Sequence, residues 1–115
     1  MCKELTSLSL LSEIEGADLY KKLIGQLNKD FNLAGIEQFF SSDCTPSELI
    51  QQLQKIVVKL ITTNFDGYLN LLYRVDLSEN KIKKLEGANL DKMSEQVAYL
   101  LLKREWQKVW FKSRF

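Results

Sequence analysis

Carboxylates are the only side chains of this 115-residue chain that are numerous and close enough to suggest acid–base chemistry. There are 15 acidic residues and no histidine, so the commonest general base near neutral pH is missing. The three close pairs are Glu13/Glu15, Asp76/Glu79 and Asp91/Glu95. Each pair falls in an expected first helical turn, where negative charge is favoured without any catalytic role. We therefore predict helix capping at these positions and no catalytic residues.

Cysteine and glycine motifs offer no other chemistry. Cys2 and Cys44 lack the Cys-x-x-Cys spacing of a structural metal site, and no histidine is present to activate a thiol. Glycine-rich phosphate loops and the Gly-x-Ser-x-Gly nucleophile elbow are also missing. These observations favour a protein that is not an enzyme and that has no cofactor and no metal. Two reduced thiols further favour a cytoplasmic location.

Cap residues followed by apolar positions three and four apart predict helices along most of the chain. The clearest signal is Thr45-Pro46-Ser47-Glu48, which combines a cap residue, a first-turn proline and a capping-box glutamate before an apolar seam ending near Thr63. Further helices are expected over Ser12–Phe31, over Leu33–Phe40, over Asp76–Gly87, and from Asn89 or Asp91 to about Lys112. Another helical segment is expected from Asn64, either as a separate helix or as a continuation of the preceding helix through a kink. The sequence predicts an all-α fold, a compact bundle of five or six helices.

The expected domain boundaries follow from the same pattern. Residues 12–115 form one domain, because no linker divides them. Residues 1–11 have weak periodicity, which is typical of a partly disordered N-terminal segment. The longest apolar run, from Val97 to Leu102, is much shorter than the roughly 20 residues required to cross a bilayer, so no transmembrane segment is predicted.

Charge is distributed unevenly between the body of the chain and its end. The chain has a net charge of +1, but five basic residues and one acidic residue give residues 103–115 a net charge of +4. A field from the whole molecule therefore does not explain binding to nucleic acid or membrane, and such binding must use a local patch.

The C-terminal segment interleaves these bases with aromatic rings and is the strongest candidate for an interaction surface. Its candidate residues are Leu101, Arg104, Trp106, Lys108, Trp110, Phe111, Lys112 and Arg114. A protein partner or a second copy of the chain is favoured, because Trp and Arg dominate binding energy at interfaces. Stacking of single-stranded nucleic acid on the rings is the main alternative, followed by an anionic membrane surface. A purely structural reading also stands, in which Trp106, Val109 and Trp110 fill the core.

Two smaller constellations complete the candidates. Arg74 and Asp76 lie two positions apart at a helix junction, where Arg74 is expected to act as a structural staple by pairing with an acid of the same chain. Binding of an anionic ligand by Arg74 is the alternative. Four aromatic residues form a weaker candidate for a small-molecule pocket, because aromatic residues at helical spacing are usually core. They are Phe39, Phe40, Tyr68 and Tyr73.

The run Leu71-Leu72-Tyr73-Arg74-Val75-Asp76-Leu77-Ser78-Glu79, with the later run Arg104-Glu105-Trp106-Gln107-Lys108-Val109, resembles segments of small uncharacterised bacterial helical proteins. That group has no known activity. The resemblance therefore implies a bacterial cytoplasmic protein and carries no mechanism.

Overall fold

The computed structural model describes residues 10–11, 14, 17–77 and 89–114, and the fold is that of this part of the chain. It contains four helices, α2 (Ala17–Leu33), α3 (Pro46–Thr63), α4 (Phe65–Val75) and α6 (Leu90–Arg114), and no strand lies among the described residues. The predicted all-α class is confirmed, whereas the predicted count of five or six helices is not matched. The expected capping box of Ser12 and Glu15 lies outside the described residues, as does most of the helix expected over Asp76–Gly87.

The start of α3 has the predicted capping box. The Thr45 hydroxyl accepts a hydrogen bond from the backbone N–H of Glu48 at 3.2 Å, and the Glu48 carboxylate accepts one from the Thr45 N–H at 3.0 Å. Hydrogen bonds to the Glu48 carboxyl group from the backbone of Thr45, and second from its side chain, lower the pKa of Glu48. The cap and the first-turn proline fix where the helix begins, and it ends at Thr63 as predicted.

Asn64 is the single residue between α3 and α4. Its backbone N–H donates to the carbonyl oxygen of Leu60 at 2.9 Å and so closes α3. Its side-chain Oδ1 accepts a hydrogen bond from the N–H of Gly67 at 3.0 Å, so that α4 begins as a separate helix and not as a kinked continuation of α3. A Cβ atom on Gly67 would lie 2.5 Å from Nδ2 of Asn64, which explains why glycine occupies this position.

The helix expected over Leu33–Phe40 is wrong beyond the end of α2. Gly35 has a φ of +78° and ends the helix in a left-handed turn. The Asn28 side chain then accepts a hydrogen bond from the backbone N–H of Phe40 at 2.8 Å and donates one to its carbonyl oxygen at 3.0 Å. These bonds satisfy backbone groups that a helix would pair internally, and they bury Phe40 while Phe39 is 76% exposed.

Asp76 is the cap that ends α4, and the helix that it was predicted to open lies outside the described residues. Its φ of 69° is left-handed, and its backbone N–H bonds to the carbonyl oxygens of Leu72 and Tyr73. Aspartate tolerates this conformation better than most residues with a Cβ atom. The chain therefore turns at Asp76 and directs its carboxylate toward α6.

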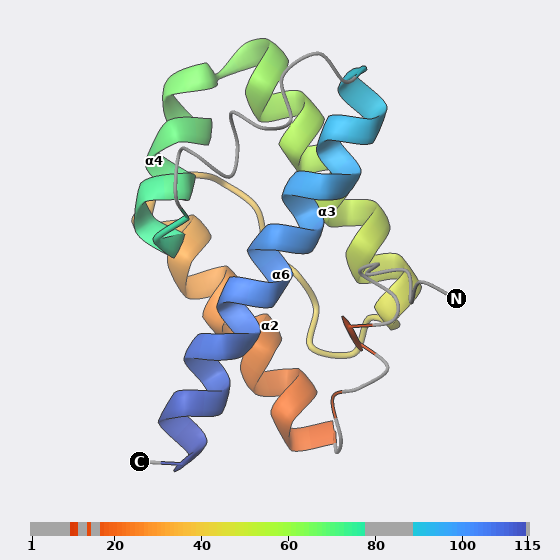
Figure 1. Cartoon of the computed structure of the whole chain (residues 1–115), viewed down its shortest axis with the longest axis vertical. Coiled ribbons are helices and arrows are strands. Elements are labelled where there is room, and N and C mark those ends of the chain that lie inside the picture. Colours follow the sequence, from red (N-terminus) through yellow and green to blue (C-terminus); the bar gives the residue numbers. More distant parts are fainter. Residues whose placement is uncertain (1–9, 12–13, 15–16, 78–88, 115) are drawn as a thin grey trace, which may run out of the picture.

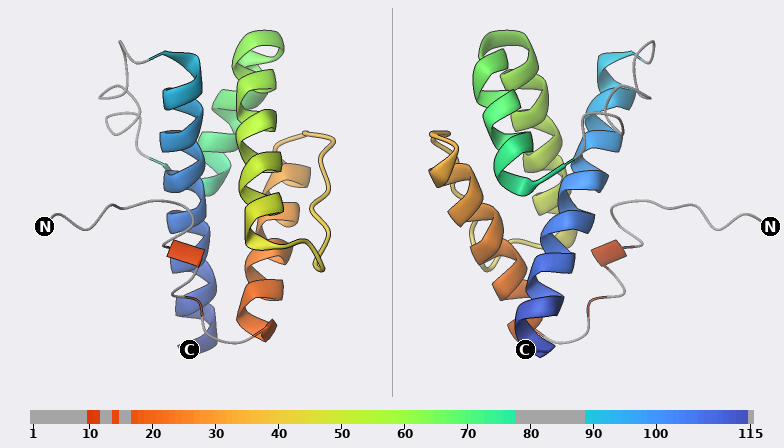
Figure 2. Two further views of the ribbon diagram at one scale, coloured as in Figure 1. Left: turned by 90° about the vertical axis from the view of Figure 1, so that its right-hand side faces the viewer. Right: turned by 60° about the vertical axis from the view of Figure 1, so that its left-hand side comes forward.

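Helix α6 runs along the molecule and packs against α2, α3 and α4 (Figures 1 and 2). Its cap is Asn89, whose Oδ1 accepts a hydrogen bond from the N–H of Lys92 at 2.8 Å. The broad apolar stretch over Val97–Leu102 supplies four fully buried residues to the core of this chain. They are Val97, Ala98, Leu101 and Leu102.

The core joins all four helices into one domain. The radius of gyration is 13.6 Å, close to the roughly 13 Å expected of a compact 100-residue domain. Leu11 is only 4% exposed and belongs to this core, although residues 1–11 were expected to form a partly disordered segment. Residues 1–9 of that segment lie outside the described part of the chain.

Candidate functional site

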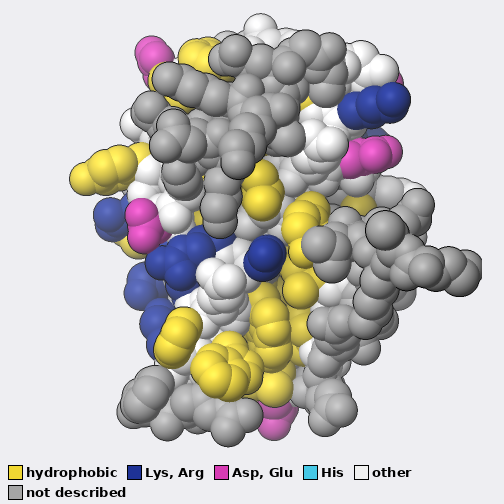
Figure 3. Space-filling view, viewed as in Figure 1, with side chains coloured by type: hydrophobic (Ala, Val, Ile, Leu, Met, Phe, Trp, Pro, Cys, Tyr) yellow, Lys and Arg dark blue, Asp and Glu magenta, His cyan; other side chains and the backbone are white. Residues whose placement is uncertain are grey.

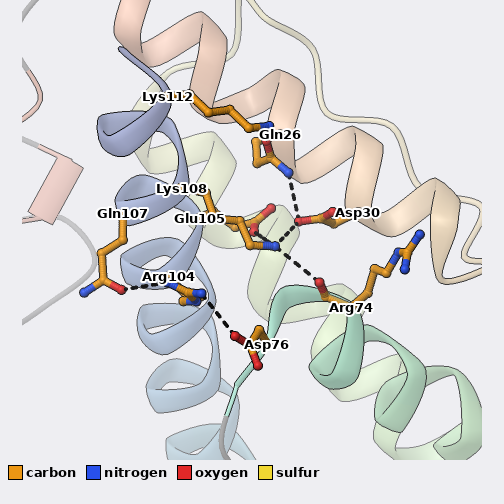
Figure 4. Close-up of polar contacts among 9 residues, drawn as sticks. All are labelled: Gln26, Asp30, Arg74, Asp76, Arg104, Glu105, Gln107, Lys108 and Lys112. Atoms are coloured by element: carbon orange, nitrogen blue, oxygen red, sulfur yellow. Dashed lines mark hydrogen bonds and ion pairs between the residues drawn. The ribbon is translucent and has the colours of Figure 1, made fainter. Parts of the chain in front are cut away.

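The C-terminal half of α6 holds a polar cluster on its inner side, formed by Gln26, Asp30, Glu105, Lys108 and Lys112 (Figure 4). The Lys108 ammonium donates to Oδ2 of Asp30 at 2.9 Å, and Gln26 donates to the same oxygen at 3.1 Å. Lys112 in turn donates to Oε1 of Gln26 at 2.9 Å. The cluster thus connects α6 to α2 through a continuous set of hydrogen bonds.

Two acids of this cluster are removed from solvent. Asp30 is 4% exposed and Glu105 is not exposed at all. Glu105 lies four positions after Leu101 and four before Val109, which are both buried, so helical geometry directs its side chain into the core. An acid on an otherwise apolar stripe is the signal by which the sequence could have revealed this site.

The two carboxyl groups are held in different protonation states. Burial by itself would raise the pKa of Asp30, but hydrogen bonds from Glu105, Lys108 and Gln26 outweigh burial and lower it. Burial raises the pKa of Glu105 to about 9, and the hydrogen bond to Asp30 and the charge of Asp30 act in the same direction against Lys108. Near neutral pH the pair therefore comprises an ionised Asp30 and a protonated Glu105.

Protonation also explains how the oxygens of Glu105 are satisfied. Within the described structure neither oxygen has a hydrogen-bond donor in good geometry, and the nearest cation is Nζ of Lys108 at 3.3 Å from Oε1. A protonated Glu105 can donate its own proton to the Asp30 carboxylate, whereas two ionised groups would only repel each other. Protonation of Glu105 thus removes the repulsion between the two buried acids.

The expected staple pairs different residues from those predicted. Asp76 forms its ion pair with Arg104 of α6 at 3.1 Å. Arg74 contributes its backbone carbonyl oxygen, which accepts a hydrogen bond from Lys108 at 3.2 Å. Figure 4 shows the Arg74 guanidinium directed away from Asp76. The end of α4 is therefore held to α6 by Arg104 and Lys108.

The outer side of the same half of α6 carries an aromatic surface, which we define as Trp106, Gln107, Trp110 and Phe111. These residues line a shallow depression of about 440 Å³. Trp110 is 40% exposed and Phe111 is 53% exposed, and their rings meet edge to face at 5.5 Å between centroids. Trp106 is partly buried against the core. Figure 3 shows hydrophobic side chains gathered on the face that α6 occupies, with Lys and Arg beside them.

The residues predicted for an interaction surface are divided between these two sides. Leu101 is fully buried and belongs to the core, because the inner apolar stripe of α6 passes through it. Arg104, Lys108 and Lys112 all have partners within the chain, as described above. Trp106, Trp110 and Phe111 lie on the outer side, and the side chain of Arg114 lies outside the described residues.

The four aromatic residues considered for a pocket do not share one. Phe40 and Tyr68 are buried, and burial raises the pKa of Tyr68 to about 12. Phe39 and Tyr73 are exposed by 76% and 84%. Packing therefore separates the four rings, and Tyr73 belongs to an outer face of α4.

Cys44 is buried, and its carbonyl oxygen accepts a hydrogen bond from the Tyr20 hydroxyl at 2.8 Å. Burial and this neighbouring cysteine raise the pKa of Tyr20.

Within the described ranges, no group of three or more His, Cys, Asp or Glu residues is placed to hold a metal ion. The helices described here are all too short or too polar to cross a membrane.

No protein-family model, curated protein or solved structure matches the chain. The resemblance to small bacterial helical proteins therefore remains a prediction.

Proposed function

We propose that this protein is a non-enzymatic interaction protein that binds an acidic, partly apolar segment of a protein partner on the aromatic surface of α6. The observation that carries the proposal is the exposure of two large rings, Trp110 and Phe111, around a depression beside Trp106. Tryptophan is among the residues most enriched at the energetic centres of interfaces. Covering these rings would remove apolar area from water at roughly 25 cal/mol per Å².

The charges on this side of α6 support an acidic partner. Lys103 is exposed one helical turn before Gln107, on the face of α6 that carries the rings. Glu105 lies two positions after it but points into the core and is kept protonated, so it does not offset this cation on the surface. An acidic segment with apolar side chains would meet complementary charge at the rim and rings at the centre.

Nucleic-acid binding through the same segment is less well supported. Phosphate binding requires cations that can pair with phosphates, and binding weakens with salt according to how many are engaged. Arg104 is paired with Asp76, and Lys108 with Asp30. Releasing these pairs would cost part of the contacts that hold α6 to α2 and α4.

The polar cluster has features of catalytic sites, because it pairs two carboxyl groups of different pKa. We propose a structural role for it, since Glu105 is fully buried and Asp30 nearly so, which leaves a substrate little access. The lack of histidine in the chain favours the same conclusion.

We propose the cytoplasm as the location, in keeping with a buried, unbridged Cys44.

Selection from a display library of random peptides tests the partner chemistry. The wild-type protein is the bait, and a Trp110→Ser/Phe111→Ser double variant is used for counter-selection. We expect enriched peptides that combine Asp or Glu with Leu or Phe, and we expect at least about tenfold weaker binding to the double variant. Because Trp106 and Trp110 are the only tryptophans, intrinsic fluorescence reports binding directly.

A matched control is Phe65→Ser/Tyr73→Ser, which removes two exposed rings from α4 instead of α6. It should bind the selected peptides as the wild type does. Enrichment of basic peptides, or equal binding to both double variants, would contradict the proposal. Salt-sensitive binding of oligonucleotides or anionic vesicles without peptide binding would replace it with the corresponding alternative.

A further inference from the structure

Helix α4 carries an apolar row on its outer side that the core does not use. Phe65, Leu69 and Tyr73 follow one another at intervals of four residues and are exposed by 52%, 41% and 84%. Positions four apart are neighbours on the surface of a helix, so the three side chains form one row along it. The inward side of α4 is filled instead by Tyr68, Leu71, Leu72 and Val75.

A polar row lies directly beside the apolar one. It consists of Asp66, Asn70 and Arg74, each one position after a member of the apolar row and each exposed. The row has an acid at its start, an amide at its middle and a cation at its end. Among the described ion pairs none includes Asp66 or Arg74.

We infer that this face of α4 binds the α4 of a second copy of the chain in antiparallel orientation about a two-fold axis. The axis would pass near Leu69, so that Leu69 meets its own equivalent and Phe65 meets Tyr73 of the second copy. The polar rows would meet on one flank, because a two-fold axis across antiparallel helices brings equivalent flanks together. Asp66 then faces Arg74 of the second copy, and the pairing occurs twice.

Charge complementarity selects this occupant and this orientation. A parallel arrangement about a two-fold axis would bring opposite flanks together, so the apolar row of one copy would meet the polar row of the other and leave its charges without partners. The antiparallel arrangement instead forms two ion pairs between Asp66 and Arg74 and leaves Asn70 opposite Asn70, where two amides can bond to each other. The row is therefore complementary to itself in one direction only.

The size of this face sets the strength of the association. Helix α4 has 11 residues and is about 16 Å long at 1.5 Å per residue. A pair of such helices covers less area than a standard stable interface, so the dimer should be weak and depend on concentration. It does not use the aromatic surface of α6, so both interactions can be tested separately.

The test is sedimentation velocity of the full chain over a wide range of concentration, with charge reversal at the two ends of the polar row. Asp66→Arg leaves a cation at both ends of the polar row, and Arg74→Asp leaves an acid at both ends. Like charges then face each other across the interface, so each variant alone should dimerise at least about tenfold more weakly than the wild type. An equimolar mixture of the two variants should form a heterodimer, because each variant then meets opposite charge. The combined Asp66→Arg/Arg74→Asp variant should dimerise like the wild type.

Circular dichroism of each variant establishes that the chain is folded, and Lys55→Asp on α3 serves as a charge-reversal control that should not change dimerisation. A wild type that stays monomeric at the highest concentration would overturn the inference. So would a mixture that behaves as the separate variants do. Dimerisation lost in Trp110→Ser/Phe111→Ser but kept in both α4 variants would instead assign self-association to α6.

Discussion

The carboxylate of Asp30 and the ammonium of Lys108 lie 2.9 Å apart although 78 positions separate them in the sequence. Asp30 is near the end of α2 and Lys108 is in the last third of α6, so this one contact determines the point along each helix at which the two pack together. Lys108 also bonds to the carbonyl oxygen of Arg74, which brings the end of α4 to the same point. Three helices thus converge on one side chain.

Lys108→Met should therefore destabilise the protein by about 2–4 kcal/mol. Removing one partner of a buried ion pair leaves the other charge without compensation, and here the ionised Asp30 loses its cation. Urea unfolding followed by circular dichroism measures the change. Lys103→Met is the control, because Lys103 is exposed on the same helix and should change stability by less than about 0.5 kcal/mol. Equal effects of the two variants would contradict the assigned role of Lys108.

Glu105→Gln should stabilise the protein at neutral pH, and the gain should depend on pH. The pKa of Glu105 is about 9 in the fold, against an ordinary value of 4.5. Between these values the folded chain holds a proton that the unfolded chain has released, so the stability of the wild type falls as pH rises through this window. Glutamine carries no ionisable proton and keeps a donor for Asp30. We expect a gain of about 1–3 kcal/mol at pH 7.

Unfolding at pH 4, 7 and 9 measures this dependence. The difference between Glu105→Gln and the wild type should be smallest at the acidic end and largest near pH 9. Glu95→Gln, an exposed substitution on the same helix, should give a curve parallel to that of the wild type. A constant difference for Glu105→Gln at all three pH values would mean that Glu105 is ionised in the fold.

Two helical glycines should respond in opposite directions to alanine. Gly25 in α2 has no atom within 4 Å of an added Cβ, so Gly25→Ala should stabilise the protein by up to about 1 kcal/mol. Gly67→Ala would bring its Cβ to 2.5 Å from Nδ2 of Asn64 and should displace this cap at a cost of about 1–2 kcal/mol. Thermal unfolding of the two variants provides the comparison. Stabilisation by both would show that Asn64 does not cap α4.

Leu53→Ala and Ile56→Ala on α3 should each cost about 2–5 kcal/mol, because they leave cavities in a packed core. Leu53 is fully buried and Ile56 is 7% exposed, so the larger loss is expected at Leu53. Chemical denaturation compares both with Lys55→Ala, an exposed change on the same helix. A loss at Leu53 no greater than at Lys55 would contradict the assigned core.

The features that were predicted correctly are those that depend on hydrogen bonds between residues close together in the sequence. The capping box of Thr45 and Glu48, the caps at Asn64 and Asn89 and the extent of α3 all depend on residues within a few positions of one another. The segment before Phe40 was mistaken for a helix because its structure depends on Asn28, twelve positions away. The pattern of neighbouring residues does not reveal a hydrogen bond between residues twelve positions apart.

The candidate site could be predicted only in part for the same reason. The aromatic surface was recognised from the composition of residues 103–115, since rings and bases alternate there. The polar cluster was missed because its residues come from α2 and α6, and a lysine paired with a distant acid has the same sequence signature as a solvated one. Glu105 alone gave a local indication, as an acid on the inward stripe between Leu101 and Val109.

The junction at Asn64 also bears on how the chain folds. Because a single residue both ends α3 and begins α4, the connection between the two helices is as short as one residue and allows only a narrow range of interhelical angles. Their contacts close a very short loop, which costs little chain entropy. We expect this hairpin to be the folding nucleus, so that Asn64→Ala slows refolding about as much as it lowers the equilibrium stability.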